Sequence, residues 1–473
     1  MDESAKCLQQ FNSKLKKYSA RQVAKLFASF NREYFKYNGD SPITHKYSNG
    51  FNSYELLIQP WLFNRIVFAS TKFSDYRSDI TVAQGWELYG LYHNYFMALD
   101  GEYAQNNYAD STKNILTPII YGHMQEQSIY QVTMNLFINR FNRTYFLLKN
   151  RKFQDIDISD LIYEKYKIDL DTYVQVISFM ALLSVSNIIL NDDDILNFFD
   201  GKELFLNILD DCSIDYSDCR DYNGKIDTFR IKPILKTSYK EYIVPNVNTM
   251  FYNLGDKLYW LMKDHFSKST IFVNQFGDIF ENYVFDILVK QYGQDSVKKI
   301  ERVKGEKSAD FIVEGTKYIF LVEVKSGVAG AEAKLQNLNQ KTLDFYIDNN
   351  ISDAMEQLDA SSKKFNDGRK IICLILNYDL SFMEDSLLLD ISKKYNPKNF
   401  DIKNLLYFGI DYFENLIAKY DNLNKLEKLF DSYEDKELNV HSLTEGCEII
   451  PNYFFEDIFN KRIDEFGKKL KHN

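Results

Sequence analysis

The chain has 473 residues, with 57 Lys and Arg against 67 Asp and Glu, and a formal net charge of -10. Its 45% apolar and 26% charged residues are typical of a globular protein, which excludes wholesale disorder and collagen-like or basic-tail architectures. Five cysteines are scattered without a C-x-x-C pair, which argues against a disulfide framework and a zinc ribbon. Because the first residues are polar and charged, we expect no signal peptide and a cytoplasmic location.

Residues 1–245 carry repeated amphipathic patterns and almost no alternating strand patterns. Apolar and aromatic residues recur there at three-to-four spacing, which predicts helices. We therefore expect a mainly helical N-terminal domain whose role, whether targeting, regulation or oligomerisation, stays open. The clearest helical patterns cover residues 4–37, 82–103, 129–149 and 170–190.

Two stretches of this half allow more than one interpretation. Residues 137–153, FINRFNRTYFLLKNRKF, interleave aromatic rings with Arg and Lys, a composition that suits a nucleic-acid track. The alternative, which we favour, is a helix with one core face and one solvated basic face. Residues 173–190 carry no charge over about the length of a membrane span. Since they include Gln175 and Asn187 and precede an acidic run, we expect a buried helix and no membrane contact.

After residue 246 the pattern changes to a long helix followed by short β-branched runs. The expected elements are a helix at 275–291, strands at 297–303, 309–313 and 318–325, a helix at 351–365 and a strand at 370–377. This αβββαβ order predicts an α+β protein in which residues 246–410 form a second domain. Helical patterns at 411–433 and 453–470 predict a C-terminal helical extension over residues 411–473.

The turn EGTK suggests a register for two of these strands. A two-residue hairpin turn at Gly315 and Thr316 pairs Glu314 with Lys317 and Asp310 with Leu321. Asp310, Glu323 and Lys325 then share one face, with Asp310 and Glu323 as diagonal neighbours about 7 Å apart. The opposite face is expected to be apolar and to hold Phe311, Val313, Phe320, Val322 and Val324.

Two carboxylates and a lysine at the end of an apolar sheet are costly unless the charges compensate one another or a metal. An oxygen-only ligand set suits Mg²⁺ or Mn²⁺ better than zinc. Lys325 would orient an attacking water or stabilise negative charge on a phosphate. In the alternative interpretation, Glu323 and Lys325 are a surface pair and Asp310 only begins a strand.

The segment SADFIVEGTKYIFLVEVKSG resembles the PD-(D/E)xK nuclease superfamily, which has the restriction-endonuclease-like fold. Asp310 and the triplet Glu323, Val324 and Lys325 match its motif, and Ala309 stands where the motif's name has proline. The resemblance implies that Asp310, Glu323 and the Val324 carbonyl ligate the metal and that Lys325 serves the water. It covers about a quarter of the chain.

Two helices extend this resemblance. GDIFENYVFDIL resembles the G-x-x-F-E-x-x-V helix of the subgroup related to modified-DNA restriction enzymes, which implies that Glu281 assists the metal site. Gln357 falls on the following helix, where some members carry an active-site glutamine, although we favour a solvated helix residue there.

We therefore expect a Mg²⁺-dependent (or Mn²⁺-dependent) nuclease, most simply a DNA endonuclease of bacterial anti-phage defence or restriction. The alternative is a catalytically silent nucleic-acid-binding or protein-interaction scaffold with the same fold. The partners expected are nucleic acid, further copies of the chain in a dimer or higher homo-oligomer, and a phage or host protein as activator. No G-x-x-x-x-G-K-[ST] loop is present, so an ATP-driven translocase on this chain is not expected.

Phosphate affinity needs a local basic patch, because acidic residues slightly outnumber basic ones over residues 271–380. A solvated surface is the alternative explanation for most of the candidates. These candidates are Arg302, Lys304, Lys307, Lys334, Lys363, Lys364, Arg369 and Lys370.

Overall fold

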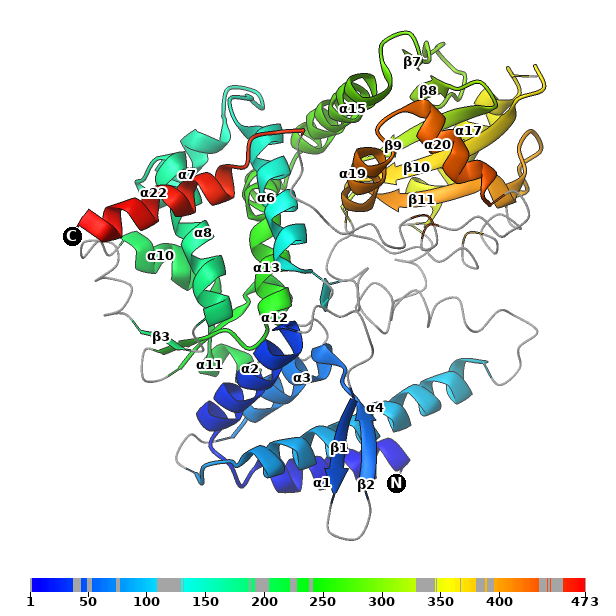
Figure 1. Ribbon diagram of the computed structural model, residues 1–473. Helices are drawn as coiled ribbons and strands as arrows, with labels where there is room; N and C mark the ends of the chain where they lie inside the picture. Colours follow the sequence, from blue (N-terminus) through cyan, green and yellow to red (C-terminus); the bar gives the residue numbers. More distant parts are fainter. Residues whose placement is uncertain are drawn as a thin grey trace.

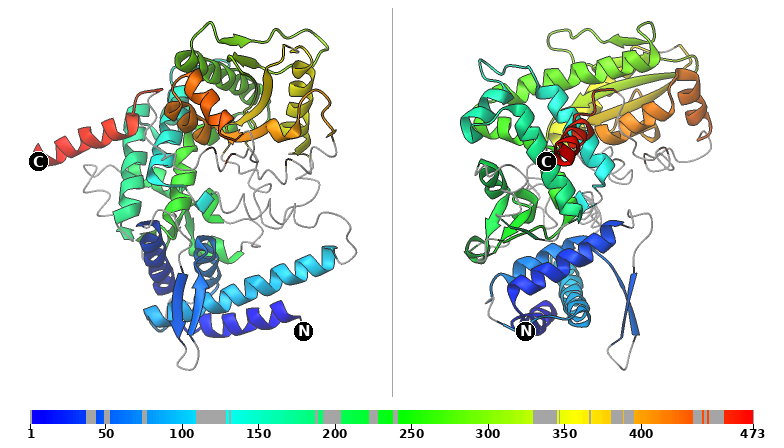
Figure 2. Two further views of the ribbon diagram at one scale, coloured as in Figure 1. Left: turned by 45° about the vertical axis from the view of Figure 1, so that its right-hand side comes forward. Right: turned by 60° about the vertical axis from the view of Figure 1, so that its left-hand side comes forward.

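The computed structural model places the N-terminal helices α1–α4 at one end of the molecule and a five-stranded sheet at the other (Figures 1 and 2). It describes residues 2–36, 44–48, 53–73, 77–108, 129–130, 132–186, 189–191, 204–221, 228–237, 241–328, 345, 347–365, 367–379, 388, 395–433, 440, 443 and 454–472. Lys334 and Cys447 lie outside these residues.

The first helices pack around an aromatic core. The elements of this part are α1 (Glu3–Leu15), α2 (Ala20–Lys36), β1 (Thr44–Ser48), β2 (Ser53–Leu57), α3 (Pro60–Ser70) and α4 (Val82–Tyr108). Helix α2 buries Val23, Phe27 and Phe30 at three-to-four spacing. Phe30 stacks on Trp86 of α4 with the ring centroids 4.3 Å apart. The single helical pattern expected at 4–37 is thus two helices, α1 and α2.

A small four-stranded sheet with the order β3-β6-β5-β4 completes this half. Its elements and the short helices beside them are β3 (Ile189–Asn191), α10 (Leu204–Asp211), β4 (Ser213–Asp215), α11 (Tyr216–Asp221), α12 (Thr228–Ile231), β5 (Ile234–Lys236) and β6 (Glu241–Ile243). The first half, expected to be mainly helical, thus also contains the short strands β1–β6 among its helices. Strands β3–β6 have three residues each, too few for an alternating pattern to stand out.

A further group of helices packs together through contacts such as α13 on α6 and α22 on α8. Its members are α6 (Met134–Leu148), α7 (Ile158–Tyr166), α8 (Leu170–Ser186), α13 (Val247–Gly255), α14 (Lys257–His265) and α22 (Ile458–His472). Helix α8 buries Tyr173, Ile177 and Met180, which confirms the expected buried helix as far as Ser186. Ile189 and Leu190, expected at its end, belong instead to β3. In the part of the chain that the structure describes, no single helix is long and apolar enough to cross a membrane. Helices α7 and α8 reach that length and composition only together, and they are bent by 75°.

Helix α6 carries two arginines that are neither solvated nor exposed to nucleic acid. Arg140 donates to Asp256 and, at 2.9 Å, to Asp411. Arg143 donates to Asp411 and, at 2.8 Å, to Glu414. Both side chains are at most 1% exposed. For these arginines the nucleic-acid track and the solvated basic face are therefore both wrong, because the charges form a buried ion network.

The five-stranded sheet has the order β11-β10-β9-β8-β7. Strands β7, β8 and β9 run antiparallel, and β10 and β11 run parallel to β9. The elements are α15 (Ile271–Tyr292), β7 (Val297–Lys299), β8 (Phe311–Glu314), β9 (Tyr318–Lys325), η2 (Asp348–Ser352), α17 (Asp353–Ser362), β10 (Lys370–Asn377), η3 (Ile402–Asn404), β11 (Leu405–Gly409), α19 (Ile410–Lys419) and α20 (Leu423–Asp431). The expected αβββαβ order is present, and β11 is an additional strand.

Helices cover both faces of this sheet. One face packs against α15, α19 and α20 through an apolar cluster that includes Phe280, Phe320 and Phe430. The other face packs against α17 through Leu321, Ile375 and Leu358. The first cluster also includes residues of helices α6, α8 and α13. One apolar cluster therefore joins these helices to the sheet, with members from Val132 to Phe459. The division into domains at residues 245 and 410 stays a prediction.

The observed register of β8 and β9 differs from the expected one. Glu314 pairs with Ile319 and Phe311 with Val322, so the predicted pairs Glu314–Lys317 and Asp310–Leu321 are wrong by two positions. The reason lies in α20, where the buried Glu427 accepts hydrogen bonds from the backbone N–H groups of Lys317 (2.7 Å) and Tyr318 (3.2 Å). The turn is therefore shifted by one residue, to Thr316 and Lys317, and the Gly315 N–H donates to the Tyr318 carbonyl across it at 2.9 Å.

A slip of two positions leaves each side chain on its original face. Phe311, Val313, Phe320 and Val322 accordingly lie in the cluster beneath α15, as expected. Asp310 precedes the Phe311–Val322 pair, and its N–H donates to the Val322 carbonyl at 3.1 Å, so its predicted pairing with Leu321 is not formed.

Candidate active site

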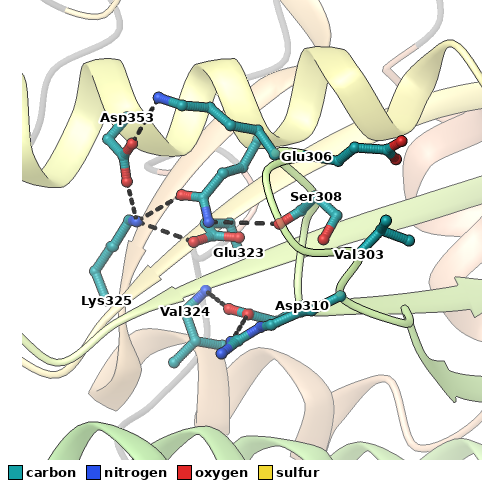
Figure 3. A pocket seen from close by; sticks show the side chains of 11 residues that line it. Val303, Glu306, Ser308, Asp310, Glu323, Val324, Lys325 and Asp353 are labelled. Carbon is teal, nitrogen blue, oxygen red and sulfur yellow. Dashed lines mark hydrogen bonds and ion pairs between the residues drawn. The ribbon is translucent and has the colours of Figure 1, made fainter. Parts of the chain in front are cut away.

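An open cavity of about 470 Å³ lies where β9 ends and β8 begins (Figure 3). Its walls come from the β7–β8 connection, the end of β9 and the first turns of α17. The lining residues are Arg302, Val303, Glu306, Lys307, Ser308, Asp310, Glu323, Val324, Lys325, Asp353 and Gln357. The structure thus brings Asp310, Glu323, Val324 and Lys325 together, as the sequence predicts.

Glu323 is a buried carboxylate with one unsatisfied oxygen. Its side chain is 2% exposed, and Oε1 lies 2.9 Å from the Lys325 Nζ. Oε2 is buried and has no hydrogen-bond partner among the described residues. Burial, followed by the neighbouring charge of Asp310, raises the pKa of Glu323 to about 8. A buried oxygen without a partner is unfavourable, so this position suits an additional cation or proton.

Asp310 is also buried, at 4% exposure, but both of its oxygens have partners. Oδ1 accepts a hydrogen bond of 2.6 Å from Arg302 Nη2, and Oδ2 accepts one of 2.9 Å from the Val324 N–H. The N–H and C=O of a strand residue point toward the same neighbouring strand. The Val324 carbonyl therefore also faces the β8 side, and the Lys325 carbonyl faces β10, where it accepts from the Tyr378 N–H.

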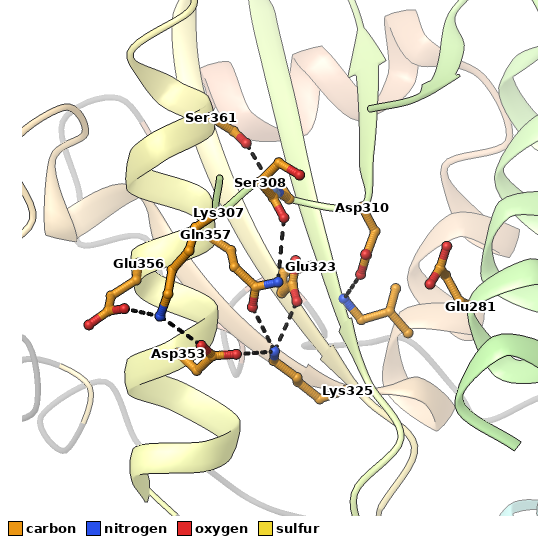
Figure 4. A network of polar contacts seen from close by, with 12 residues as sticks. Glu281, Lys307, Ser308, Asp310, Glu323, Lys325, Asp353, Glu356, Gln357 and Ser361 are labelled. Carbon is orange, nitrogen blue, oxygen red and sulfur yellow. Dashed lines mark hydrogen bonds and ion pairs between the residues drawn. The ribbon is translucent and has the colours of Figure 1, made fainter. Parts of the chain in front are cut away.

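Lys325 is held by three acceptors (Figure 4). Besides Glu323, its Nζ donates to Gln357 Oε1 at 2.8 Å and to Asp353 Oδ2 at 3.1 Å. Burial lowers the pKa of Lys325, but the charges of Glu323 and Asp353 outweigh that effect and raise it. The lysine is therefore a fixed cation with a defined direction, in place of the surface pair considered as the alternative.

Helix α17 contributes more to the site than the sequence predicts. Gln357 is not the solvated residue we favour, because it bonds Lys325 and also donates to the Ser308 carbonyl at 3.4 Å. Asp353 is missed altogether, although it stands four residues before Gln357 and so shares its helical face. The four-residue spacing is the only sequence signal that links Asp353 to Gln357. It points to the site only once the packing of α17 against the sheet is known.

Glu281 lies beside the cavity on α15 and reaches the site through Arg302. The Arg302 Nη2 donates to Glu281 Oε2 at 2.7 Å as well as to Asp310. Burial and the charge of Asp310 raise the pKa of Glu281, against the lowering effect of Arg302. The structure therefore places Glu281 next to Asp310 but does not test the expected role of assisting a metal.

The basic candidates divide by position. Arg302 and Lys307 line the cavity, and Lys307 bonds Asp353 at 2.9 Å and also Glu356. Arg369 and Lys370 lie at the opposite end of the sheet, because Lys370 pairs with Tyr318 at the start of β9. Both are therefore wrong as residues near the site. The remaining described candidates are not among the lining residues. Lys304 is exposed, and Lys363 and Lys364 follow the C-terminal end of α17.

The residues present fit a hard divalent cation. Among the described residues, no group of three or more His, Cys, Asp or Glu side chains converges on one point. Asp310, Glu323 and Val324 line one cavity, and a set of two carboxylates and a carbonyl would leave the remaining positions to water or substrate phosphate, as Mg²⁺ prefers. The unsatisfied Glu323 Oε2 is the observation that favours this fit. The ligand set itself stays a prediction.

Comparison with known proteins gives one weak likeness. No protein-family model matches the sequence, and no curated protein matches it. The chain shows a distant structural similarity to the small subunit (R.BspD6I2) of the heterodimeric restriction endonuclease R.BspD6I. The sequences are 14% identical, the match covers 44% of this chain and 96% of that subunit, and the TM-score is 0.21.

The raised pKa of Glu323 predicts how the metal-free protein responds to pH. The folded protein holds the proton of Glu323 more tightly than the unfolded chain does. The stability that this gives is complete at pH values below the pKa of the unfolded state, and it is lost as the pH rises to about 8. Between pH 5 and pH 8.5 we expect the wild type to lose stability, on the order of a few kcal/mol, relative to Glu323→Gln. Urea unfolding in EDTA across this range measures it. Parallel pH profiles for the two proteins would contradict the assignment.

Proposed function

We propose that the protein is a metal-dependent nuclease that hydrolyses phosphodiester bonds, with DNA as the substrate. One observation carries the proposal. Lys325 is held by three acceptors beside a buried carboxylate whose second oxygen is unsatisfied, inside a cavity open to a large substrate. A buried oxygen without a hydrogen-bond partner destabilises the protein until a cation or proton binds it. A purely structural ion pair gains nothing from such an oxygen.

The side chains divide the work of hydrolysis. Asp310, Glu323 and the Val324 carbonyl would hold the metal, which supplies charge neutralisation at the scissile phosphate and activates water. The three N–H donors of Lys325 are used by Glu323, Gln357 and Asp353 in this structure. Lys325 would therefore stabilise the developing negative charge by its own positive charge, or exchange one of these acceptors for the attacking water or a phosphate oxygen. Gln357 and Asp353 hold the direction of Nζ, because each accepts one of its hydrogen bonds. Their contribution is positioning.

The biological setting we propose is anti-phage defence or restriction in the bacterial cytoplasm. The cavity of one chain contains one set of Asp310, Glu323 and Lys325, so cutting both strands of a duplex most simply uses two copies. A homodimer or higher homo-oligomer is therefore part of the proposal. The helical N-terminal region would carry targeting or regulation, with a phage or host protein as the activator.

Metal removal tests the function most directly. The full chain is incubated with supercoiled plasmid, linear duplex, single-stranded DNA and RNA in 5–10 mM Mg²⁺ or Mn²⁺, about the millimolar range at which such sites are filled. We expect cleavage of DNA that EDTA abolishes and added Mg²⁺ restores. Conversion of supercoiled plasmid to open-circular or linear forms would identify an endonuclease.

The scaffold alternative makes the opposite prediction. A silent module would bind nucleic acid with an affinity that Mg²⁺ leaves unchanged, and it would cut none of the four substrates. Mn²⁺ binding by the metal-free protein separates the cases further. Absence of binding at millimolar Mn²⁺ would contradict the metal site and with it the proposed function.

A further inference from the structure

Arg302 occupies a position that the proposed metal would compete for. Its Nη2 donates to Asp310 Oδ1 at 2.6 Å and to Glu281 Oε2 at 2.7 Å, so one nitrogen bridges two carboxylates. The other Asp310 oxygen already accepts from the Val324 N–H. An incoming divalent cation that uses Asp310 Oδ1 must take the place of the guanidinium, because two cations at one oxygen repel each other.

The guanidinium is placed so that it can leave Asp310 without leaving the cavity. The Arg302 side chain is 62% exposed, whereas the side chains of Asp310 and Glu323 are at most 3% exposed. Within the described part of the chain, its hydrogen bonds all use Nη2, so the other N–H groups of this largely exposed side chain can take a further acceptor. Glu281 accepts from the same nitrogen and would keep the arginine near the site after Asp310 is released.

The chemistry of arginine indicates which ligand those N–H groups can bind. A guanidinium has five N–H donors in a planar fork that matches two oxygens of a phosphate. Arg302 lines the same cavity as Lys325. A phosphodiester in that cavity would therefore meet Arg302 from the β7–β8 connection and Lys325 from β9.

We propose that Arg302 is a replaceable counterion. It neutralises Asp310 and Glu281 in the metal-free protein, and when a divalent cation binds it moves to an oxygen of the substrate phosphate. This inference rests on the proposed nuclease function and assigns a substrate-binding residue to it. Glu281 then acts as a positioning residue for Arg302, in place of the direct assistance to the metal that its sequence resemblance implies.

The proposal predicts effects of opposite sign on metal binding and on cleavage. Arg302→Met removes the competing charge, so we expect Mn²⁺ to bind the full-length protein about tenfold more tightly. At saturating Mn²⁺, the same variant should cut DNA about 10- to 100-fold more slowly, because a phosphate contact is lost. Arg302→Lys keeps the charge and should bind Mn²⁺ with nearly wild-type affinity.

The matched control is Arg369→Met, which removes an arginine that bonds Asp367 and the Gly315 carbonyl at the opposite end of the sheet. It should leave both measurements unchanged. Calorimetric titration of metal-free protein with Mn²⁺ gives the affinity, and plasmid cleavage gives the rate. Thermal melts in EDTA report folding.

Each outcome bears on one claim. If Arg302→Met binds Mn²⁺ with unchanged or weaker affinity, the claim that Arg302 competes with the metal for Asp310 is wrong. Tighter Mn²⁺ binding with wild-type cleavage would overturn the phosphate contact. Glu323→Gln separates these failures from that of the function. If Glu323→Gln binds Mn²⁺ as tightly as the wild type, the metal site itself is wrong, whatever Arg302 does.

Discussion

Lys325→Met is expected to reduce the DNA cleavage rate about 10²- to 10³-fold while leaving Mn²⁺ binding at or above the wild-type affinity. The reason is that the lysine ligates no metal but places a positive charge beside the cavity, where negative charge develops on the phosphate or the water. Its removal leaves the oxygens of Asp310 and Glu323 in place and takes away a cation 2.9 Å from Glu323. Single-turnover cleavage and Mn²⁺ titration measure the two effects.

Two companion variants make this result specific. Lys298→Met removes an exposed lysine on β7 that pairs with Glu314, and it should cut at the wild-type rate. Glu323→Gln should lose cleavage and Mn²⁺ affinity together, because it removes a proposed ligand. Wild-type cleavage by Lys325→Met would show that this lysine only neutralises Glu323. If Lys325→Met melts at a lower temperature and this loss of folding accounts for its lost activity, the lysine would likewise have a structural role only.

Arg143→Met is expected to destabilise the protein by about 3–5 kcal/mol. Arg143 is 1% exposed and pairs with Asp411 and Glu414, which are at most 2% exposed. Burial already raises the pKa of Glu414, against the stabilising charge of Arg143. Without Arg143, Asp411 retains its ion pair with Arg140, whereas Glu414 loses the ion pair that Arg143 supplies. A buried charge that loses its partner is strongly unfavourable.

Urea unfolding, followed by fluorescence and by circular dichroism, measures this effect. Arg151→Met is the matched control, because Arg151 is exposed just beyond the same helix and should change stability by less than about 0.5 kcal/mol. Adding Glu414→Gln to Arg143→Met should restore part of the loss, since one unpaired charge disappears. Equal unfolding midpoints for Arg143→Met and Arg151→Met would contradict a structural role for the network.

The elements predicted most accurately are those with long, uninterrupted patterns. Strands β9 and β10 have the bounds at which they are expected, because apolar runs bounded by turn residues and charges mark both ends. Strand β11 is missed, since LLYFG continues into the apolar pattern of α19 with only Gly409 at the boundary between them. Periodicity alone does not separate a short buried strand from the start of a helix.

The sequence by itself determined the alternation of β8 and β9, and this alternation brings Asp310, Glu323 and Lys325 to one cavity. Because side chains alternate with a period of two, a register shift of two positions leaves each of them on the same face of the sheet. Only the tertiary structure decided the register, because Glu427 of α20 holds the turn, and only the docking of α17 brought Asp353 and Gln357 to Lys325. These contacts join residues about 30 to 110 positions apart, and no local pattern encodes which helix face meets which strand end.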